Sequence, residues 1–274
     1  VTPFDGSDYG SSISDSISVQ NGCTSLSFDG TSHRVQITHP NLPSGNDSRT
    51  FTVWATIENQ ADLGNLFTYG NADFTSSNER FSLIAEPGSG SLRFAGQNND
   101  HFYGTSVSLS VWHHIALTFD GSVLSLFIDG VLENTATTTL NTAAAYPMIV
   151  GSNTLNRDDE YFAGTISNLT VWDRALSSAE VADDMTGVQP TSPLANWRFG
   201  PNSYDAESGT VSILNEGAVG VNECPDQDID GDGYSAWEDC DDGDPTAWGF
   251  GSGASLNCPA VSCQTILDDG YSMG

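Results

Sequence analysis

The sequence predicts an all-β fold: an antiparallel two-sheet sandwich of the jelly-roll kind, with one short helix and an irregular acidic C-terminal extension. Two observations lead to this prediction. Many short segments alternate apolar and polar residues with a period of two, and turn residues separate them at regular spacing. The segment 111–130 is a hairpin pattern that is apolar on both faces, and such a hairpin needs a second sheet to cover it.

The hairpin is the clearest element. Its first arm places alternate residues on one face: Val111, His113, Ile115, Leu117 and Phe119. Asp120-Gly121 connects the arms and Asp129-Gly130 closes the second one. Asp-Gly suits a tight turn because glycine adopts a positive φ without steric cost. We therefore expect two neighbouring core strands here.

The other strands follow the same pattern, between turn signals rich in Gly, Asn, Asp and Pro. The Ser-rich stretch 1–20 suits an edge strand or an extended arm. Strands are expected near 24–28, 33–37, 50–57, 64–69, 80–85, 90–95, 101–108, 111–119, 122–128, 131–137, 146–150, 161–172, 193–198 and 209–214.

One helix interrupts the strands. Ser177 and Glu180 form a capping box, in which each side chain bonds the other residue's backbone N–H. Val181 and Met185 then share one face, and Gly187 is placed to end the helix. We expect this helix to cover one end of the sandwich.

The strongly acidic composition excludes some classes of binding partner. The chain of 274 residues has a net charge of −29, from 36 acidic against 7 basic residues, and every basic residue is Arg. Such a surface repels nucleic acid and anionic membranes and attracts cations. No apolar run reaches the ~20 residues that cross a bilayer. No signal peptide is visible at 1–4, so we expect either that one was removed or that the chain is a segment of a longer protein.

Cysteine usage suggests an oxidising compartment, hence a secreted or cell-surface protein. Four of the five cysteines lie in the acidic tail, and the odd number leaves one thiol free or paired with another chain. The five disulfide candidates are Cys23, Cys224, Cys240, Cys258 and Cys263.

The tail also carries a metal-binding pattern. A 12-residue loop at 228–239 has carboxylates at positions 1, 3, 5 and 12 and glycine at position 6, a spacing that wraps oxygen ligands around one Ca²⁺. Position 12 is Asp and no amphipathic helices flank the loop, so we expect a calcium loop without an EF-hand helix pair. The alternative is a solvated acidic linker. The expected ligands are Asp228, Asp230, Asp232, Tyr234 through its carbonyl, and Asp239, with Asp226, Asp242 and Asp244 for a second ion.

Several motifs in order resemble a laminin-G-like, concanavalin A-type jelly roll of the pentraxin branch. They are LSFDGTSHRVQI at 26–37, FTVWATI at 51–57, WHHIALTFDG at 112–121, LSLFIDGVL at 124–132, FAGTISNLTVWDRALSSAEV at 162–181 and LANWRFG at 194–200. The resemblance covers about 21–220 and implies recognition of a glycan or surface ligand. In this fold the first and last strands are neighbours, which would bring Cys23 near Cys224; the alternative is pairing within the tail.

The chain departs from pentraxins in two ways. Trp54 and Ala116 stand where their core disulfide would lie. Of their calcium ligands, Asn78 fits, and Asp159 and Glu160 lie near the pattern, but Asn153, Thr154 and Leu155 replace the acidic run. A pentraxin-type double calcium site is therefore not expected.

Two further resemblances concern the tail. The continuation at 239–245, DCDDGDP, resembles thrombospondin type-3 repeats and MopE-like motifs of bacterial surface proteins, and 258–274 resembles the opening of fibrinogen-like domains. The expected organisation is an arm at 1–20, a sandwich at 21–220, a calcium-binding region at 221–250, and a tail at 251–274 that begins another domain.

Catalysis has little support. His113 and His114 point to opposite faces of a strand, so they cannot share a metal. No strand carries the alternating acids of laminarinase-type enzymes, and nucleophile-elbow, HExxH and P-loop motifs are absent. We expect a non-catalytic, exported, calcium-binding recognition module; the alternatives are a self-associating surface subunit and, last, a glycosidase. Candidate ligand contacts are Asn78, Asn98, Asn99, Asp100, Phe102, Tyr103, Asn153, Asp159, Glu160 and Tyr161.

Overall fold

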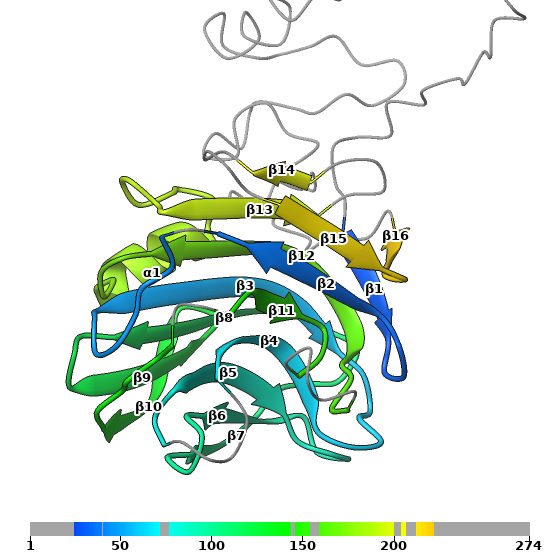
Figure 1. The fold of residues 1–274 in the computed structure, drawn as a ribbon, viewed down its shortest axis with the longest axis horizontal. Coiled ribbons are helices and arrows are strands. Elements are labelled where there is room, and N and C mark those ends of the chain that lie inside the picture. Colours follow the sequence, from blue (N-terminus) through cyan, green and yellow to red (C-terminus); the bar gives the residue numbers. More distant parts are fainter. Residues whose placement is uncertain are drawn as a thin grey trace, which may run out of the picture.

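The computed structural model describes residues 25–39, 41–71, 77–143, 146–153, 159–199, 204–206 and 212–221. Two antiparallel sheets face each other across one apolar core, which confirms the predicted sandwich (Figure 1). The expected arm at 1–20, the acidic loop and all five cysteines lie outside the described residues, so the structure leaves those predictions untested.

The larger sheet has nine strands, in the order β10-β9-β8-β3-β12-β1-β16, with β13 and β14 joined to it through β12. Its strands are β1 (Ser25–Asp29), β3 (Arg49–Ile57), β8 (Trp112–Phe119), β9 (Val123–Ile128), β10 (Val131–Thr137), β12 (Ala163–Trp172), β13 (Ala195–Phe199), β14 (Tyr204–Ala206) and β16 (Val219–Val221).

The smaller sheet has seven strands, in the order β15-β2-β11-β4-β5-β6-β7. Its strands are β2 (Arg34–Thr38), β4 (Gly64–Gly70), β5 (Arg80–Ala85), β6 (Ser91–Ala95), β7 (His101–Ser106), β11 (Met148–Val150) and β15 (Ser212–Glu216). All fourteen strands expected from 24–28 onward are present, and β14 and β16 are additional.

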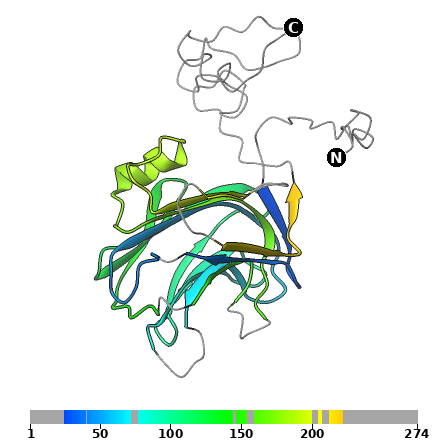
Figure 2. The same ribbon diagram turned by 45° about the horizontal axis from the view of Figure 1, so that its top comes forward.

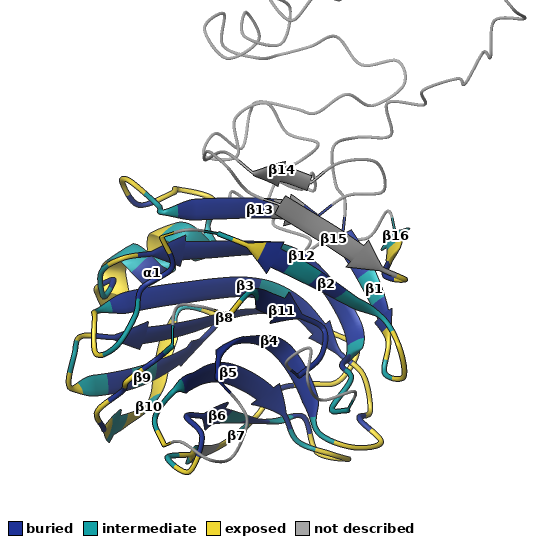
Figure 3. Ribbon diagram, in the orientation of Figure 1, coloured by how far each residue is buried: buried dark blue, intermediate teal, exposed yellow. Residues whose placement is uncertain are grey.

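Aromatic side chains dominate the core between the sheets. Phe51 stacks on Phe67 and Tyr69 with ring centroids 5.0 and 5.3 Å apart, and Phe81 closes the group at 5.1 Å from Phe51. All four are fully buried, and the strands that carry them, β3, β4 and β5, are mostly dark blue in Figure 3. Each such ring stabilises the fold by about 1.5–3 kcal/mol, so this group holds the two sheets together.

A buried arginine ties a loop to this core. The Nε of Arg49 donates to the Asp47 carbonyl at 2.8 Å, and its Nη atoms reach the carbonyls of residues 43–45, the Thr142 hydroxyl and the Tyr69 hydroxyl. Burial raises the pKa of Tyr69 to about 12. Backbone carbonyls thus satisfy most of the donors of this buried guanidinium.

The helix α1 (Ser178–Met185) begins as expected. The Ser177 hydroxyl accepts from the Glu180 N–H at 3.3 Å, and the Glu180 carboxylate accepts from the Ser177 N–H at 2.9 Å. Val181 is the buried residue of the helix and packs on the outer face of the nine-stranded sheet, beside Trp172. The predicted capping box is therefore confirmed, and Figure 2 shows α1 outside the sheet layers.

The first and last described strands are antiparallel neighbours. Ser25 of β1 lies opposite Val221 of β16, and Leu26 lies opposite Gly220. This is the arrangement on which the expected Cys23–Cys224 pairing depends, although both cysteines lie beyond the described residues.

The described ranges contain no helix with the length and apolar character needed to cross a membrane.

Candidate ligand-binding site

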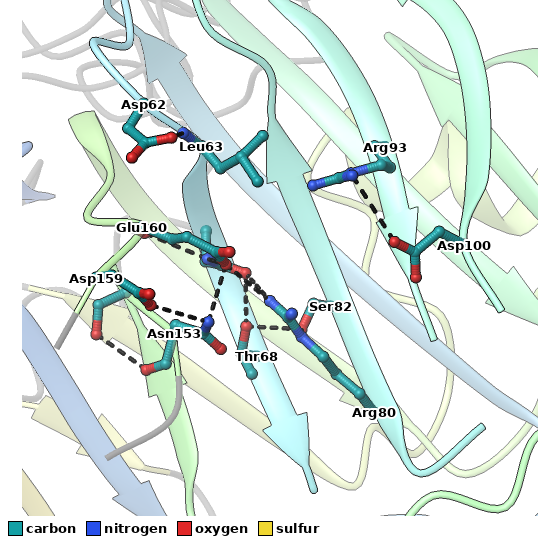
Figure 4. Close-up of polar contacts among 12 residues, drawn as sticks. Asp62, Leu63, Thr68, Arg80, Ser82, Arg93, Asp100, Asn153, Asp159 and Glu160 are labelled. Carbon is teal, nitrogen blue, oxygen red and sulfur yellow. Dashed lines mark hydrogen bonds and ion pairs between the residues drawn. The ribbon is translucent and has the colours of Figure 1, made fainter. Parts of the chain in front are cut away.

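The outer face of the seven-stranded sheet carries a connected group of polar side chains. We name it the Asn65–Glu160 cluster, after two of its members. Thr68 and Ser82 lie opposite each other on β4 and β5 and form its floor. Its members are Asn65, Thr68, Arg80, Ser82, Asn153, Asp159 and Glu160, and Figure 4 shows six of them as labelled sticks beside the two strands.

An irregularity in β4 delivers Asn65 to this face. In a regular strand, Asn65 would point to the same side as Phe67 and Tyr69, into the core. The pairing register with β5 shifts between Asn65 and Phe67, and the extra residue, Leu66, is buried in the core cluster. A β-bulge of this kind re-aims the preceding side chain, so Asn65 meets Thr68 instead of the apolar core.

The inner part of the cluster is a closed ring of hydrogen bonds. The Nε of Arg80 donates to Ser82 Oγ at 2.7 Å, and Ser82 Oγ donates to Thr68 Oγ1 at 2.6 Å. Thr68 Oγ1 donates to Asn65 Oδ1 at 2.8 Å, and Arg80 Nη2 donates to the same oxygen. Arg80 is only 4% exposed. Burial lowers the pKa of its guanidinium, and the Glu160 carboxylate opposes that shift.

The outer part of the cluster centres on one carboxylate oxygen. Glu160 Oε2 accepts from Asn65 Nδ2 at 3.0 Å and from Asn153 Nδ2 at 2.9 Å, and it lies 3.4 Å from Arg80 Nη2. The Asn153 amide also donates to Asp159 Oδ1 at 3.2 Å. These contacts make the cluster one continuous network from the sheet to its covering segment.

The backbone at Glu160 is held in an uncommon conformation. Its φ is +55°, in the left-handed region that non-glycine residues rarely occupy. Its carbonyl accepts from the Asn65 backbone N–H at 3.1 Å and from Asn65 Nδ2 at 3.2 Å. Strain of this kind persists where surrounding contacts fix it, and it gathers at functional positions.

The cluster has a buried layer and an accessible layer. Asn65, Thr68, Arg80, Ser82 and Asn153 are buried, whereas Asp159 and Glu160 are half-buried. The buried layer fixes the orientation of the two carboxylates. The accessible layer presents carboxylate oxygens, which are hydrogen-bond acceptors.

Three expected ligand contacts, Asn153, Asp159 and Glu160, therefore meet in one place, and Tyr161 follows them half-buried. Asn78 joins another contact set: its N–H donates to the Gln97 carbonyl at 2.9 Å, and its carbonyl accepts from the Asn141 N–H at 2.8 Å.

The remaining candidates lie around the β6–β7 hairpin. Asn99 donates to Thr138 Oγ1 at 2.7 Å, and Asp100 Oδ2 lies 3.7 Å from Arg93 Nη1. Asn98 takes a positive φ in the turn between these strands. Phe102 and Tyr103 lie on β7, but their side chains are outside the described set.

The cluster does not fit a metal ion as it stands. Across the described ranges, no three His, Cys, Asp or Glu side chains gather in an arrangement that could hold one. Both amides of the cluster turn their N–H groups toward the Glu160 carboxylate, and so does Arg80.

Trp54 and Ala116, at the positions of the pentraxin disulfide, lie on neighbouring strands of the larger sheet.

The adjacent histidines serve different contacts. His113 Nδ1 lies 2.8 Å from Asp129 Oδ2, whereas His114 Nε2 lies 3.1 Å from Asp184 Oδ2 of α1. The two rings thus meet separate carboxylates, as the alternation of side chains along β8 requires.

The two antiparallel sheets place the protein among the jelly-roll sandwiches. Residues 29–182, more than half of the chain, match the laminin G family described as the concanavalin A-like lectin/glucanases superfamily, and the chain belongs to this family.

The similar proteins agree with this fold. A pentraxin-containing protein of Rattus norvegicus, with sushi, von Willebrand factor type A and EGF domains, is 27% identical over 131 residues, which are 44% of this chain and 4% of that protein. A candidate carbohydrate-binding protein from Bacteroides ovatus superposes with a TM-score of 0.58 at 14% identity, over 73% of this chain and 59% of the other. A heptameric SAP-like pentraxin from Limulus polyphemus gives 0.50 at 16% identity, over 70% and 94%.

Proposed function

We propose that the sandwich is a non-catalytic recognition module that binds a glycan or a glycan-bearing surface ligand at the Asn65–Glu160 cluster. The observation that carries this proposal is the layered cluster: two half-buried carboxylates stand over a buried network that fixes them. Such preorganised acceptors lose little freedom when a ligand binds.

The chemistry of the accessible layer favours sugars. Asp159 and Glu160 offer carboxylate oxygens to hydroxyl groups, and Tyr161 supplies a neighbouring aromatic ring. The Bacteroides ovatus protein that shares the fold carries a carbohydrate-binding description, which supports the proposal by analogy only.

A binding role suits the cluster better than catalysis. A glycosidase needs one carboxyl group to protonate the leaving oxygen and a second to act on the sugar. Glu160 Oε2 already accepts N–H groups from Asn65, Asn153 and Arg80. This oxygen is therefore held by N–H donors and is not available as an acid or a nucleophile, and we propose no reaction.

We also propose that the acidic region binds Ca²⁺, with Asp228, Asp230, Asp232, Tyr234 and Asp239 around a first ion. Asp226, Asp242 and Asp244 would serve a second. Binding would neutralise neighbouring carboxylates and stiffen this part of the chain. An equilibrium count of bound calcium tests the proposal, and a count of zero in millimolar Ca²⁺ would reject it.

The register of β1 and β16 supports a disulfide between Cys23 and Cys224. Ser25 and Val221 lie opposite each other, and in the sequence Cys23 stands two residues before Ser25 and Cys224 three residues after Val221. Peptide mapping without reduction tests this link. Such a bond would also fit the proposed secretion or cell-surface location.

Self-association is the second candidate function. Val131 and Leu132 are 59% and 48% exposed on β10, which ends the nine-stranded sheet. Exposed apolar residues on an edge strand favour pairing with another chain. Light scattering across a concentration series with Ca²⁺ separates the candidates, because a strict monomer contradicts self-association.

A glycan array with matched variants tests the recognition function. We expect the wild-type chain to bind a defined set of glycans, Glu160→Gln to lose at least tenfold in affinity, and Glu180→Gln to bind normally, because Glu180 lies on α1 over the other sheet. Failure of the wild-type chain to bind any glycan, with and without EDTA, would reject the proposal.

A further inference from the structure

We propose that the guanidinium of Arg80 supplies, in the Asn65–Glu160 cluster, the positive charge that a bound metal cation would otherwise supply. The recognition face then needs no divalent ion, and removing the Arg80 charge opens a Ca²⁺ site. This inference concerns the sandwich and is separate from calcium in the acidic region. Only its consequence for ligand recognition rests on the proposed function.

The chemistry of the cluster would otherwise suit a hard cation. Carboxylate and amide oxygens are the ligands that Ca²⁺ prefers, and Asn65, Asn153, Asp159 and Glu160 supply both kinds within one network. The charge that the network receives comes instead from Arg80, whose Nη2 lies 3.4 Å from Glu160 Oε2 and also donates to Asn65 Oδ1.

Arg80 is fixed in this position. Its Nε donates to Ser82 Oγ, its Nη2 donates to Asn65 Oδ1, and its side chain is only 5% exposed. Swinging the guanidinium away would break both bonds and leave a buried charge without its partners, which is costly. A calcium ion therefore cannot displace Arg80 without loss of the ring beneath it.

The amides are engaged in a way that excludes a metal while Arg80 is present. Asn65 and Asn153 both aim Nδ2 at the Glu160 carboxylate. Asn65 Oδ1 faces the guanidinium and accepts from Arg80 and Thr68, so Arg80 occupies the place from which a metal ion would reach this oxygen. The network is thus arranged around a cation that donates hydrogen bonds, and only removal of the Arg80 charge leaves these oxygens for a metal ion.

A second arginine on the same sheet provides a matched control. Arg93 Nε lies 3.0 Å from Glu86 Oε1, and its Nη1 lies 3.7 Å from Asp100 Oδ2 (Figure 4 draws the latter pair). It has the charge of Arg80, lies on the same sheet and also pairs with carboxylates, but those carboxylates are outside the Asn65–Glu160 cluster. Removing its charge should create no calcium site.

The functional consequence is that ligand binding by the sandwich does not depend on calcium. If the cluster binds glycans, binding continues when EDTA removes calcium, whereas the acidic region loses its ions. Recognition by the sandwich and ordering of the acidic region would then respond to calcium independently.

Calorimetric titration of the full chain with Ca²⁺ alone tests the inference. We expect Glu160→Gln to bind as many ions as the wild type, Arg80→Gln to bind one more, Arg80→Gln/Glu160→Gln to lose that ion, and Arg93→Gln to match the wild type. A lower count in Glu160→Gln would overturn the inference, as would an unchanged count in folded Arg80→Gln.

The Glu160→Gln comparison decides the matter even if Arg80→Gln fails to fold, because it keeps Arg80 and removes only the carboxylate charge. The titration also separates this inference from the recognition proposal. A negative glycan array with the expected calcium counts rejects glycan binding and leaves the role of Arg80 standing.

Discussion

The two outer faces of the sandwich are buried by different kinds of contact. On the nine-stranded sheet, α1 covers the face and buries an apolar group made of Ala116, Phe127, Trp172, Leu176 and Val181. On the seven-stranded sheet, the Asn65–Glu160 cluster buries amides, hydroxyls and an arginine in a hydrogen-bonded network. One face is closed by hydrophobic burial, and the other is built from directional contacts.

The difference has an energetic meaning. Apolar burial is non-directional and stabilises in proportion to area, whereas a hydrogen bond exchanged with water contributes only about 0.5–1.5 kcal/mol net. Directional bonds do, however, fix where each oxygen points. The apolar face therefore serves stability, and the polar face can serve recognition, which the following variants examine.

The largest expected effect is on the apolar face. Trp172→Ala removes a fully buried indole and should lower the free energy of unfolding by about 3–5 kcal/mol in denaturant titrations. Trp112→Ala, at the partly exposed start of β8, is the control and should cost clearly less. Glycan binding by folded Trp172→Ala should match the wild type; a selective loss of binding would contradict the separation of the two faces.

A smaller loss of stability is expected from the polar face, but with loss of binding. Asn65→Leu keeps the volume and deprives Arg80, Thr68 and Glu160 of a shared partner. Unsatisfied buried groups cost about 1–3 kcal/mol, so the free energy of unfolding should fall by that amount and glycan affinity at least tenfold. Asn41→Leu, at an exposed position, should change neither quantity. Normal binding by Asn65→Leu would show that the network does not orient the carboxylates.

The smallest effect is a pH dependence confined to α1. A hydrogen bond from Arg174 and bonds from the Ser177 N–H and hydroxyl lower the pKa of Glu180 from 4.5 to about 2. A lowered pKa in the folded state contributes stability that is present above pH 4.5 and is lost as the pH falls toward 2. Because Glu180 is partly exposed, solvent screens its contacts, and the contribution should be below about 1 kcal/mol.

Comparison of wild type with Glu180→Gln at pH 6 and pH 2.5 measures this effect. The difference in the free energy of unfolding should be present at pH 6 and mostly absent at pH 2.5. A constant difference at both values would mean that Glu180 acts through shape and not through charge.

Much of the fold was accessible to sequence reasoning. Period-two alternation located the long strands, and Ser177 with Glu180 located α1, because both signals are local. β14 and β16 have three residues each, too short for a period to be visible, whereas the equally short β11 is a continuous apolar run, Met148–Val150. The acidic loop and the cysteines stay predictions.

The candidate site was harder to predict from the sequence, because long-range contacts form it. Asp159 and Glu160 were found through the family resemblance, but alternation assigns Asn65 to the core, and only the bulge at Leu66 reverses that assignment. Arg80 reads as one polar residue in a strand, and its partner Glu160 lies 80 residues away. Long-range pairing brings them together, and no local pattern encodes it.

The pairing of β1 with β16 has a mechanical consequence. The chain enters the sandwich at Ser25 and leaves it at Val221, and these two residues face each other across one ladder. If Cys23 and Cys224 are not bonded to each other, tension applied through the flanking segments would load the ladder rungs one after another, and β16 would separate at low force while the aromatic core stayed intact. The proposed Cys23–Cys224 disulfide would carry the tension itself and leave β16 paired with β1.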